Sequence, residues 1–365
     1  MSASKIKLAV LFGGRSSEHE VSCVSAAAVI ENASKERYEV IPVGITREGA
    51  WWQYTGETEK IRTGEWERDS EHLIPAVPSP CTVHHGLLVF HKPTKTYQVL
   101  ALDCILPVVH GENCEDGRLQ GLLEAGGVPY VGCRTCSSAI TMDKVFTKMI
   151  VDGQGIAQAR WMLLMPRDYE DTQAVTQRLE GRFSYPFFVK PANAGSSKGI
   201  SRVKNRGELK EALALAAAID PKLVVEEAIV GREIEVALLD GMENGKRVTR
   251  ATVCGEIRPD SDFYSYESKY ISGGSRCEIP AKLEESVART VRETALRIFD
   301  LLDCRGLSRA DFFVTEDGRV IFNEINTIPG CTPISMYPKL WEYEGISFPE
   351  LVDRWVDFAM KGESK

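Results

Sequence analysis

The segment from Arg309 to Asn326 constrains the fold of this chain more than any other part of the sequence. Two short apolar runs, 311–314 and 320–325, flank the pair Asp317–Gly318. An Asp-Gly pair between two such runs is the strongest short signal for a β-hairpin, because both residues tolerate the positive φ of a tight turn. The segment therefore predicts two antiparallel strands joined by a two-residue turn.

A two-residue turn would determine which side chains meet across the hairpin. Opposed residues lie at equal distances from the turn, and side chains two apart on a strand share a face. One face should then carry three opposed pairs, namely Arg309 with Asn326, Asp311 with Glu324, and Phe313 with Phe322. An ordinary solvated face is the alternative, but it would leave both phenylalanines in water. A bulged turn would shift the register by one residue and break the pairing.

The polar residues of this predicted face suit a hard cation. Asp311 and Glu324 offer carboxylates and Asn326 offers an amide oxygen. Mg²⁺ prefers oxygen ligands and keeps water or substrate phosphates in its coordination shell. The hairpin therefore predicts a magnesium site.

Bulk properties exclude several classes of protein. At 365 residues the chain is expected to contain two or three packed units. The formal charge of −8 argues against a nucleic-acid-binding surface, which would be basic. No segment reaches the roughly 18 uninterrupted apolar residues of a membrane helix, and the N-terminus shows no signal-peptide pattern. We therefore expect a cytoplasmic protein that binds neither nucleic acid nor membrane.

The ten cysteines predict neither a disulfide framework nor a zinc site. Cys133 and Cys136 form one CxxC pair, but no second pair and no paired histidines stand at zinc-binding spacing. The pair also lacks surroundings typical of a redox site, so reduced thiols without a special role are favoured.

Residues 1–138 are expected to form an N-terminal α/β unit. The apolar run Ile6–Phe12 ends in two glycines, and apolar residues at helical spacing and a second run, Val40–Ile45, follow it. This order is a βαβ opening and predicts a parallel sheet. The polar segment from Trp51 to about Pro80 is interpreted as an insertion with its own hairpins, and Leu102–Val109 as another buried strand.

Two further units are expected, at 139–230 and 231–365. The second unit begins with a helix around residues 142–144 and contains the strand Phe187–Lys190. The third unit carries the polar loop 261–276, an amphipathic helix from about Leu283 to Leu302, and the hairpin.

The loop 194–199, with the sequence Ala-Gly-Ser-Ser-Lys-Gly, is a candidate phosphate-binding loop. Its backbone N–H groups can wrap an oligophosphate, and Lys144 and Lys190 can neutralise the charge. The spacing is not that of a Walker A loop, and the loop taken alone is better explained as a surface turn. Beside a magnesium hairpin it predicts a lid over a nucleotide.

Residues 13–20 lie where the first strand leads into a helix, and helix N-termini attract anions. The segment is not GxGxxG, so a dinucleotide is not expected. Glu18 in this place suits the ammonium of a zwitterion whose carboxylate faces the helix. The alternative is that Ser16, Ser17 and Glu20 only cap the helix.

Taken together, these residues resemble the D-alanine–D-alanine ligases of the ATP-grasp superfamily, along essentially the whole chain. Four motifs carry the resemblance: Gly-Gly with Glu-His-Glu-Val-Ser in 13–22, Lys-Pro with Gly-Ser-Ser and Gly in 190–199, Tyr-Glu-Ser-Lys-Tyr at 266–270, and Asn-Glu-Ile-Asn-Thr-Ile-Pro-Gly at 323–330. The resemblance implies an α/β protein of three-subdomain ATP-grasp architecture. An N-terminal parallel-sheet domain precedes two α+β subdomains that sandwich ATP.

The resemblance also implies which residues bind the cofactors. ATP would be bound by a set of residues along the second and third units. Lys144, Lys190 and Ser197 would bind its phosphates. Its adenine would lie against Glu226, Glu227, Ala228 and Ile229, and Glu233 would bind its ribose. Lys269 would hold the transferred phosphate, and Phe313 and Asn323 would complete the nucleotide site. Asp311, Glu324 and Asn326 would hold two Mg²⁺ ions, for which Mn²⁺ is a possible substitute.

A second set of residues would bind two molecules of D-alanine. By the same resemblance, Glu18 holds the ammonium of the first D-alanine, His110 contributes to substrate binding, and Ser196 and Tyr270 close over the site. Ser335 and the backbone of Met336 would hold the second carboxylate, and Arg309 with the Gly330 N–H would stabilise the oxyanion. Cys114 stands where the family usually has glycine, so a positive φ at this position would strain the loop after His110.

The activity implied is the ATP-dependent joining of two D-alanine molecules through an acyl phosphate for peptidoglycan precursor synthesis, by a homodimer. A ligase that takes D-serine, or less readily D-lactate, as second substrate is one rival. Tyr270 favours an amine over D-lactate and Met336 favours D-alanine over D-serine, whereas residues 41–46 are similar to D-serine-type ligases. A catalytically silent nucleotide-binding regulator is the other rival. Such a protein should have lost one of the hairpin residues Arg309, Asp311, Glu324 or Asn326, and none is missing.

Overall fold

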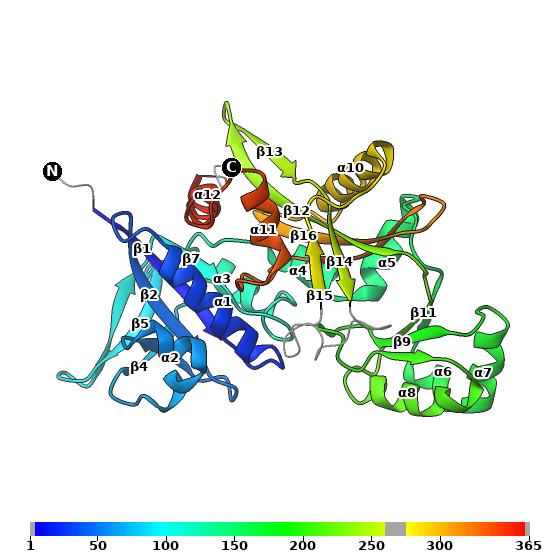
Figure 1. Ribbon diagram of the computed structural model, residues 1–365. Coiled ribbons are helices and arrows are strands. Elements are labelled where there is room, and N and C mark those ends of the chain that lie inside the picture. The colour runs from blue at the N-terminus through cyan, green and yellow to red at the C-terminus, as the bar shows by residue number, and fades with distance from the viewer. Residues whose placement is uncertain (1–3, 260–274, 362–365) are drawn as a thin grey trace.

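A computed structural model describes residues 4–259 and 275–361 of the chain. Within these residues the strands form three sheets, each with helices packed against it (Figure 1). The N-terminal sheet lies at one end of the molecule, a small sheet at the other, and the third sheet between and above them (Figure 1). This arrangement confirms the predicted α/β class.

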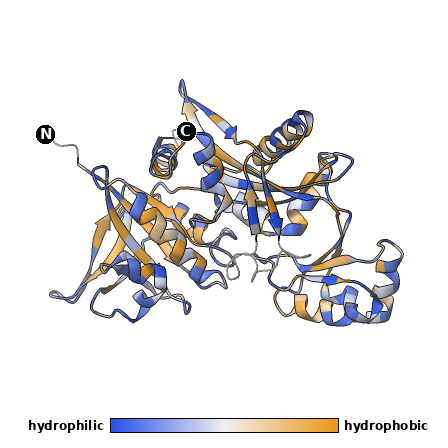
Figure 2. Cartoon of the chain, in the orientation of Figure 1, coloured by the Kyte–Doolittle hydropathy of each residue, from blue (hydrophilic) through white to orange (hydrophobic). Residues whose placement is uncertain are grey.

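The N-terminal sheet is mixed rather than parallel. Its strand order is β6-β5-β4-β3-β2-β1-β7, in which β1 (Ile6–Gly13) pairs in parallel with β2 (Tyr38–Ile45) and with β7 (Cys104–Pro107). Helix α1 (His19–Asn32) makes the crossover between β1 and β2, as the apolar pattern predicted. Hydrophobic residues follow the strands of this sheet (Figure 2), because β1 is covered on both faces and buries Leu8 to Phe12 completely.

The segment from Trp51 to Pro80 is not a separate insertion, and that interpretation was wrong. Its strands β3 (Trp51–Tyr54) and β4 (Leu73–Pro78) extend the sheet edge antiparallel, and β5 (Gly86–His91) and β6 (Thr96–Ala101) follow them. Between β3 and β4 lie α2 (Thr58–Thr63) and the 3₁₀ helix η1 (Glu65–Arg68). Trp66 is fully buried against Gly44 of β2, where a Cβ would lie 2.3 Å from its ring. Tyr54 and Ile61 are fully buried as well, and the polar composition of the segment hid these anchors.

The central unit is a small antiparallel sheet with helices on one side. Its strand order is β10-β9-β11-β8, formed by Ser201–Val203, Phe187–Pro191, Leu223–Glu227 and Trp161–Leu164. The helical segments of this unit are α6 (Pro166–Tyr169), α7 (Thr172–Glu180), η2 (Arg206–Glu208) and α8 (Leu209–Ala217). Apolar residues of α7 and α8 pack onto β9 and β11 in one hydrophobic cluster.

The third unit is built on the long strand β12 (Arg232–Glu243). Its sheet has the order β15-β14-β12-β16-β17, and β13 (Lys246–Ala251) pairs with the outer half of β12. The remaining strands are β14 (Gly255–Pro259), β15 (Ser275–Glu278), β16 (Leu307–Val314) and β17 (Val320–Asn326). Helix α10 (Glu285–Leu301) covers one face, close to the predicted range.

Helix α5 (Lys144–Gly153) connects the central and third units. Val151 lies in the hydrophobic cluster of the third sheet, whereas Val145 packs with Ala192 and Val224 of the central sheet. The preceding helices α3 (Arg118–Gly126) and α4 (Thr135–Met142) lead the chain into it from the N-terminal unit. Because α5 contacts both sheets, its residues are fixed relative to both walls between which ATP is expected.

The C-terminal helices lie between the first and third sheets. Helices α11 (Met336–Tyr343) and α12 (Phe348–Lys361) share one hydrophobic cluster with β1, α1 and β12. At its rim the Tyr38 hydroxyl donates to Asp353 over 2.5 Å and Arg37 pairs with Asp357. The chain end therefore holds the N-terminal unit against the rest. In the part of the chain that the structure describes, no helix is long and apolar enough to span a membrane.

The hairpin has the predicted strands but not the predicted turn. Thr315 N–H donates to Arg319 O over 3.1 Å, and Gly318 has φ of 79°, so the loop contains three residues instead of two. This shifts the register by one. A bulge at Asn323 shifts it back, because Phe312 opposes Phe322 whereas Asp311 opposes Glu324.

The three-residue loop and the bulge determine which of the three predicted pairs form. Arg309 opposes Asn326 and Asp311 opposes Glu324, as expected. The expected pairing of Phe313 with Phe322 was wrong. Phe322 is buried in the core and packs edge-on against Phe312 at 5.8 Å between ring centroids. The face therefore keeps its polar residues and loses one phenylalanine.

The docking of α12 yields a stability prediction. Trp355 is fully buried between the first and third sheets, so Trp355→Ala should lower the free energy of unfolding by about 3–5 kcal/mol. Met360 on the same helix is 39% exposed, and Met360→Ala should cost well under half of that. Urea unfolding monitored by circular dichroism measures both. Equal losses in the two variants would show that α12 is not a core element.

Candidate active site

Three carboxylates lie in one row across the third sheet. Glu235 of β12 is directly opposite Asp311 of β16, which is directly opposite Glu324 of β17. Opposed side chains of an antiparallel sheet stand on the same face with Cβ atoms about 4.5–5.5 Å apart. Like charges at this spacing repel one another, so the row requires cations.

Arg309 supplies one of these cations. Its guanidinium donates from Nε and one Nη to the two oxygens of Asp311, over 2.8 and 2.7 Å, and its Nε lies 3.0 Å from Glu235 Oε2. Burial acts to lower the pKa of Arg309, but Asp311 and Glu235 outweigh burial and raise it well above its usual range. Arg309 therefore stays charged and binds two carboxylates of the row.

Glu235 was missed in the sequence. It stands two residues after Glu233, on the same face of β12, and the alternation of that strand was visible. What the sequence did not show is that β12 pairs with β16 and so brings this face beside the hairpin. The pairing also places the two predicted nucleotide residues Glu233 and Phe313 directly opposite each other.

The predicted metal residues lie together. The Asn326 amide donates to Asp311 Oδ2 over 3.1 Å, beside Glu324 on the same face. Among the described residues there is no group of three or more His, Cys, Asp or Glu side chains arranged to hold a metal by themselves. Two carboxylates and an amide are nevertheless the incomplete oxygen set that suits Mg²⁺ when phosphates and water supply its other ligands. The donor chemistry fits the ion, and the assignment stays a prediction.

A cluster of lysines adjoins this row. Lys190 of β9 donates to Glu226 Oε2 over 2.7 Å, and Lys148 of α5 lies 3.1 Å from Glu226 Oε1. Burial acts to lower the pKa of Lys144, while Glu324 acts to raise it and Lys190 to lower it further, and the net shift is downward. The three ammoniums and Arg309 thus face Glu226 and the three carboxylates of the row. Lys144 and Lys190 are the cations that could turn towards an anionic ligand beside this row.

Glu226 binds its lysines tightly. Burial acts to raise its pKa, but Lys148 and Lys190 outweigh burial and lower the pKa to about 2. Glu226 was predicted to line the adenine, which stays a prediction, and its side chain forms ion pairs with two lysines. Lys148 was not predicted at all. It stands one helical turn after Lys144, and that spacing was the available signal.

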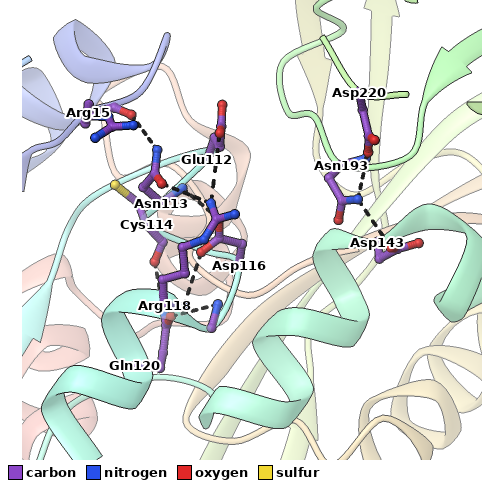
Figure 3. Close-up of polar contacts among 11 residues, drawn as sticks. Arg15, Glu112, Asn113, Cys114, Asp116, Arg118, Gln120, Asp143, Asn193 and Asp220 are labelled. Carbon is purple, nitrogen blue, oxygen red and sulfur yellow. Dashed lines mark hydrogen bonds and ion pairs between the residues drawn. The ribbon is translucent and has the colours of Figure 1, made fainter. Parts of the chain in front are cut away.

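The glycine–serine loop is attached to the start of α5. Asn193 Nδ2 donates to Asp143 Oδ2 over 3.3 Å and to Asp220 Oδ2 over 2.7 Å (Figure 3). Asp143 also caps α5 by accepting from Val145 N–H over 3.0 Å, and Lys144 Nζ donates to Ala194 O over 2.6 Å. The loop and the lysine helix are therefore held as one structure.

The loop reaches the N-terminal unit at Glu18. A Cβ on Gly195 would lie 2.2 Å from Glu18 Oε1, and a Cβ on Gly111 would lie 3.0 Å from the same oxygen. Ser196 and Ser197 have φ of 47° and 59°, a left-handed conformation that non-glycine residues seldom adopt. The predicted substrate residue Glu18 and the predicted lid are thus in contact, and Gly111, with φ of 77°, adopts a conformation that favours glycine.

His110 lies next to Glu18 in a buried setting. Its Nδ1 is 3.0 Å from Ile328 O and 3.4 Å from Glu115 Oε1. Burial acts to lower the pKa of His110, but Glu115 outweighs burial and the pKa is raised. Its Nε2 lies 3.3 Å from Ser25 Oγ, which also accepts from Cys331 N–H over 3.3 Å. Ser25, which joins His110 to the loop after β17, was not predicted.

Cys114 is not strained, so the expected strain in its loop was wrong. The residue with positive φ is Asn113, at 65°, and asparagine tolerates this conformation. Figure 3 shows Asn113 donating to Arg15 O over 2.9 Å and accepting from Arg118 over 2.9 Å. Cys114 itself is buried beside Gly14 and accepts from Gln120 at its carbonyl over 2.9 Å. The loop accommodates Cys114 without strain because Asn113, the residue before it, adopts the positive φ of the turn.

The predicted second subsite is present only in part. Gly330 and Ser335 are close, since a Cβ on Gly330 would lie 3.0 Å from Ser335 Oγ. Ser335 Oγ also accepts from Thr332 N–H over 3.0 Å. The Met336 side chain, however, is buried in the core with Tyr337, so its burial does not support the expected role of Met336 in favouring D-alanine over D-serine.

The other residues predicted to line the adenine directly follow Glu226, and their role stays a prediction. Glu227 pairs with Arg160, whose Nε donates over 2.6 Å, and Ala228 and Ile229 are half-buried in the link between β11 and β12. Lys269 and Tyr270 fall outside the described residues, as does most of the predicted loop 261–276.

Comparison with protein families agrees with this geometry. Residues 7–133 match the family model described as D-ala D-ala ligase N-terminus, and residues 150–357 match the one described as D-ala D-ala ligase C-terminus. The chain belongs to the D-alanine–D-alanine ligase family.

Relatives of this ligase family match the chain over nearly its whole length. The D-alanine–D-alanine ligase of Acetivibrio thermocellus is 43% identical over 98% of this chain and 96% of its own length. That of Caldicellulosiruptor bescii is 45% identical over 98% and 96%. Among solved structures, the VanG D-Ala:D-Ser ligase of Enterococcus faecalis superposes with a TM-score of 0.86 at 38% identity, covering 98% of this chain and all of that one. The D-alanine–D-alanine ligase of Coxiella burnetii gives 0.81 at 35%, covering 98% and 94%.

The lysine cluster of this ligase yields a pH prediction. Because the pKa of Glu226 is lowered from 4.5 to about 2 in the folded state, its ionisation should contribute about 3 kcal/mol to the free energy of unfolding near neutral pH. That contribution is complete above the unfolded pKa and is lost as pH falls from about 4.5 towards 2. Glu226→Gln should therefore be much less stable than the native chain at pH 7 and nearly equal to it at pH 2.5.

Urea unfolding at a series of pH values measures this difference. Glu227→Gln is the matched control, because its carboxylate pairs with a largely exposed arginine on the surface. A stability gap for Glu226→Gln that stayed constant across the acid range would show that the ion pairs with lysine are not its source.

Proposed function

We propose that this chain uses ATP to join two D-alanine molecules into D-alanyl-D-alanine, releasing ADP and phosphate. The observation that carries the proposal is the meeting of three predicted sites at one place. The hairpin row with Asp311 and Glu324 lies in electrostatic contact with Lys144, and the loop that Lys144 binds touches Glu18. A cation site, a phosphate site and an ammonium site are the parts that this reaction needs.

In the first step the γ-phosphoryl group of ATP passes to a carboxylate oxygen of the first D-alanine. The bond to the β-phosphate oxygen breaks, and an acyl phosphate and ADP form. Lys190 and Lys144 stabilise the negative charge that spreads over the phosphoryl oxygens. Glu18 holds the ammonium of the same substrate, and the loop 194–199 covers it and excludes water, which would hydrolyse the acyl phosphate.

In the second step the amine of the second D-alanine attacks the acyl carbon. Arg309 and the Gly330 N–H stabilise the oxyanion, phosphate leaves with the bonding electrons, and the attacking nitrogen loses a proton to complete the peptide bond. Ser335 orients the carboxylate of this substrate. His110, held by Ile328 O and Glu115, fixes the loop beside Glu18.

Two Mg²⁺ ions belong to this proposal, with Mn²⁺ as a possible substitute. Asp311, Glu324 and Asn326 would hold them, and when bound they neutralise charge on the β- and γ-phosphates. The fit of the donor set supports this assignment. For the metal to bind, Asp311 must share its oxygens with the cation as well as with Arg309.

D-serine as second substrate is the alternative that a specific observation favours. The D-Ala:D-Ser ligase of Enterococcus faecalis has the higher TM-score of the two solved structures compared above. The buried Met336 removes the argument that its side chain selects against D-serine. D-alanine remains the proposal because the curated relatives are named for it. The silent-regulator alternative is disfavoured by the intact set of Arg309 and the hairpin residues.

A test of this function measures phosphate release with D-alanine alone and then with D-serine or D-lactate added, and identifies products by mass spectrometry. The native chain should form D-alanyl-D-alanine as main product. Glu324→Gln should reduce its rate by at least about 100-fold without loss of stability, because one charge is removed from the cation site. Glu316→Gln, on the exposed turn of the same hairpin, is the control and should keep the native rate. D-alanyl-D-serine as main product, or near-native turnover of Glu324→Gln at millimolar Mg²⁺, would contradict the proposal.

We place the enzyme in the cytoplasm. The ten cysteines are all free thiols, which suits a reducing compartment.

A homodimer also belongs to the proposal, and one face of the N-terminal sheet supports it. Val77, Leu88 and Val99 are directly opposed on β4, β5 and β6, and Phe90 and Tyr97 continue the same face. Tyr97 and Val99 are 56% and 48% exposed, whereas the other face covers a hydrophobic cluster. An apolar face on an edge strand is an unfavourable surface for a monomer. A two-fold axis beside β6 would bury it against its copy.

Tyr97→Asp combined with Val99→Asp should convert the dimer into a monomer, because the pairing face would carry two charges. Light scattering after size-exclusion chromatography gives the mass. Val83→Asp, at a position 87% exposed outside the strands, should leave the mass unchanged. A native chain that is already monomeric at micromolar concentration would contradict the dimer.

A further inference from the structure

Lys148 is a buried ammonium to which the proposed reaction gives no role. Its side chain is only 3% exposed, on α5 one turn after Lys144. Its Nζ lies 3.1 Å from Glu226 Oε1 and donates to Gln158 Oε1 over 3.4 Å. A buried lysine costs several kcal/mol unless it is paired, so the Lys148 ammonium depends on the Glu226 carboxylate.

The partner of Lys148 is shared with Lys190. Glu226 uses one oxygen for each lysine, Oε1 for Lys148 and Oε2 for Lys190, the latter at 2.7 Å. The two lysines differ in exposure, because the Lys190 side chain is 14% exposed and extends from the strand next to the glycine–serine loop. Lys190 can therefore reach towards a ligand, whereas Lys148 is enclosed.

The backbone of Lys148 is also held in place by Gln158. Gln158 Nε2 donates to the backbone oxygen of Lys148 over 2.8 Å and to Asp152 Oδ1 over 2.6 Å. Residue 158 forms a β-bridge with Phe322 next to the bulge of β17. Gln158 therefore links the part of α5 that carries Lys148 to the hairpin strand β17.

The proposed function creates a difficulty that this arrangement resolves. Lys190 donates to Glu226, yet the proposed reaction also requires this ammonium to stabilise the phosphates of ATP. If Lys190 left a carboxylate that had no other cation, a buried charge would remain unpaired at a cost of several kcal/mol. That cost would make the free energy of ATP binding less favourable.

We propose that Lys148 is a positioning residue that keeps Glu226 neutralised and so lets Lys190 move from Glu226 to the phosphates of the nucleotide. Lys148 acts through Glu226 and does not itself touch the ligand. The inference rests on the proposed function, because it assumes that Lys190 binds phosphate. The lowered pKa of Glu226 agrees with it, since the carboxylate must stay ionised in both states.

Binding of the nonhydrolysable analogue AMP-PNP with Mg²⁺, measured by calorimetry, tests the inference in a double-mutant cycle. Lys148→Met should weaken binding by about tenfold or more in the native background, because Glu226 then holds Lys190 alone. In the Glu226→Gln background the same substitution should change affinity by less than about twofold, because Lys190 has no carboxylate to leave. Lys148→Arg, which keeps the charge, should stay near the native affinity.

Each other outcome has a definite meaning. If Lys148 only attracts phosphate through space, the loss is the same in both backgrounds, and the inference is wrong. No loss in the native background also overturns it. If Lys148→Met does not fold, as urea unfolding would show, Glu226→Gln is compared with the double variant Lys148→Met/Glu226→Gln, which removes the charges as a pair. A difference of about tenfold between them overturns the inference.

Lys190→Met separates this inference from the proposed function. Both the proposed function and the inferred role of Lys148 predict that Lys190→Met strongly weakens the binding of AMP-PNP. If Lys190→Met binds as the native chain does, the assignment of Lys190 to the phosphates fails. If Lys190→Met weakens binding and Lys148→Met does not, only the role of Lys148 fails.

Discussion

The pairing of β16 with two antiparallel neighbours is the interaction on which the site depends. It places Glu235, Asp311 and Glu324 side by side across three strands. A row of like charges on a sheet is unfavourable by itself. Arg309 makes it tolerable by binding two of the three carboxylates, and Lys144 is drawn to the third. The order of strands therefore determines the order of charges, and the charges determine what kind of ligand can enter.

The site is balanced so that most cations already have a protein partner. Lys190 binds Glu226, Lys144 donates to the Ala194 carbonyl, and Arg309 donates to Asp311. Such pairs keep a highly charged site folded in the absence of ligand, because an unpaired buried charge costs several kcal/mol. Each ammonium has three N–H donors, so Lys144 and Lys190 keep donors for a ligand beyond these contacts.

Much of the fold could be predicted from the sequence because local patterns determine local structure. The βαβ opening, the helix 285–301 and the two strands of the hairpin follow from apolar spacing. The opposition of Asp311 and Glu324 was predicted correctly although the turn was wrong. The three-residue loop and the bulge at Asn323 each shift the register by one, in opposite directions. Alternation alone cannot show such a pair of irregularities, and Phe322, which lies between them, was placed on the wrong face.

The missed residues depend on pairings that are distant in sequence. Glu235 joins the site only because β12 lies beside β16, and Ser25 only because α1 lies beside the loop at Cys331. Met336 follows the predicted substrate residue directly in sequence, but the first turn of α11 directs its side chain into the core. Neither composition nor local periodicity carries this information. The family resemblance named candidate site residues and left the direction of individual side chains open.

The position of the last helix has a consequence for how the chain is made. Leu8 and Val10 of the first strand share one hydrophobic cluster with Trp355 and Val356 near the chain end. A growing chain emerges from its N-terminus, so this face of the first sheet, which α1 covers in part, lacks the cover of α11 and α12 until nearly all residues have been synthesised. Contacts this distant in sequence form slowly and leave apolar surface exposed in the meantime. The N-terminal unit, although it is first in the sequence, is therefore among the last parts of the molecule to complete its core.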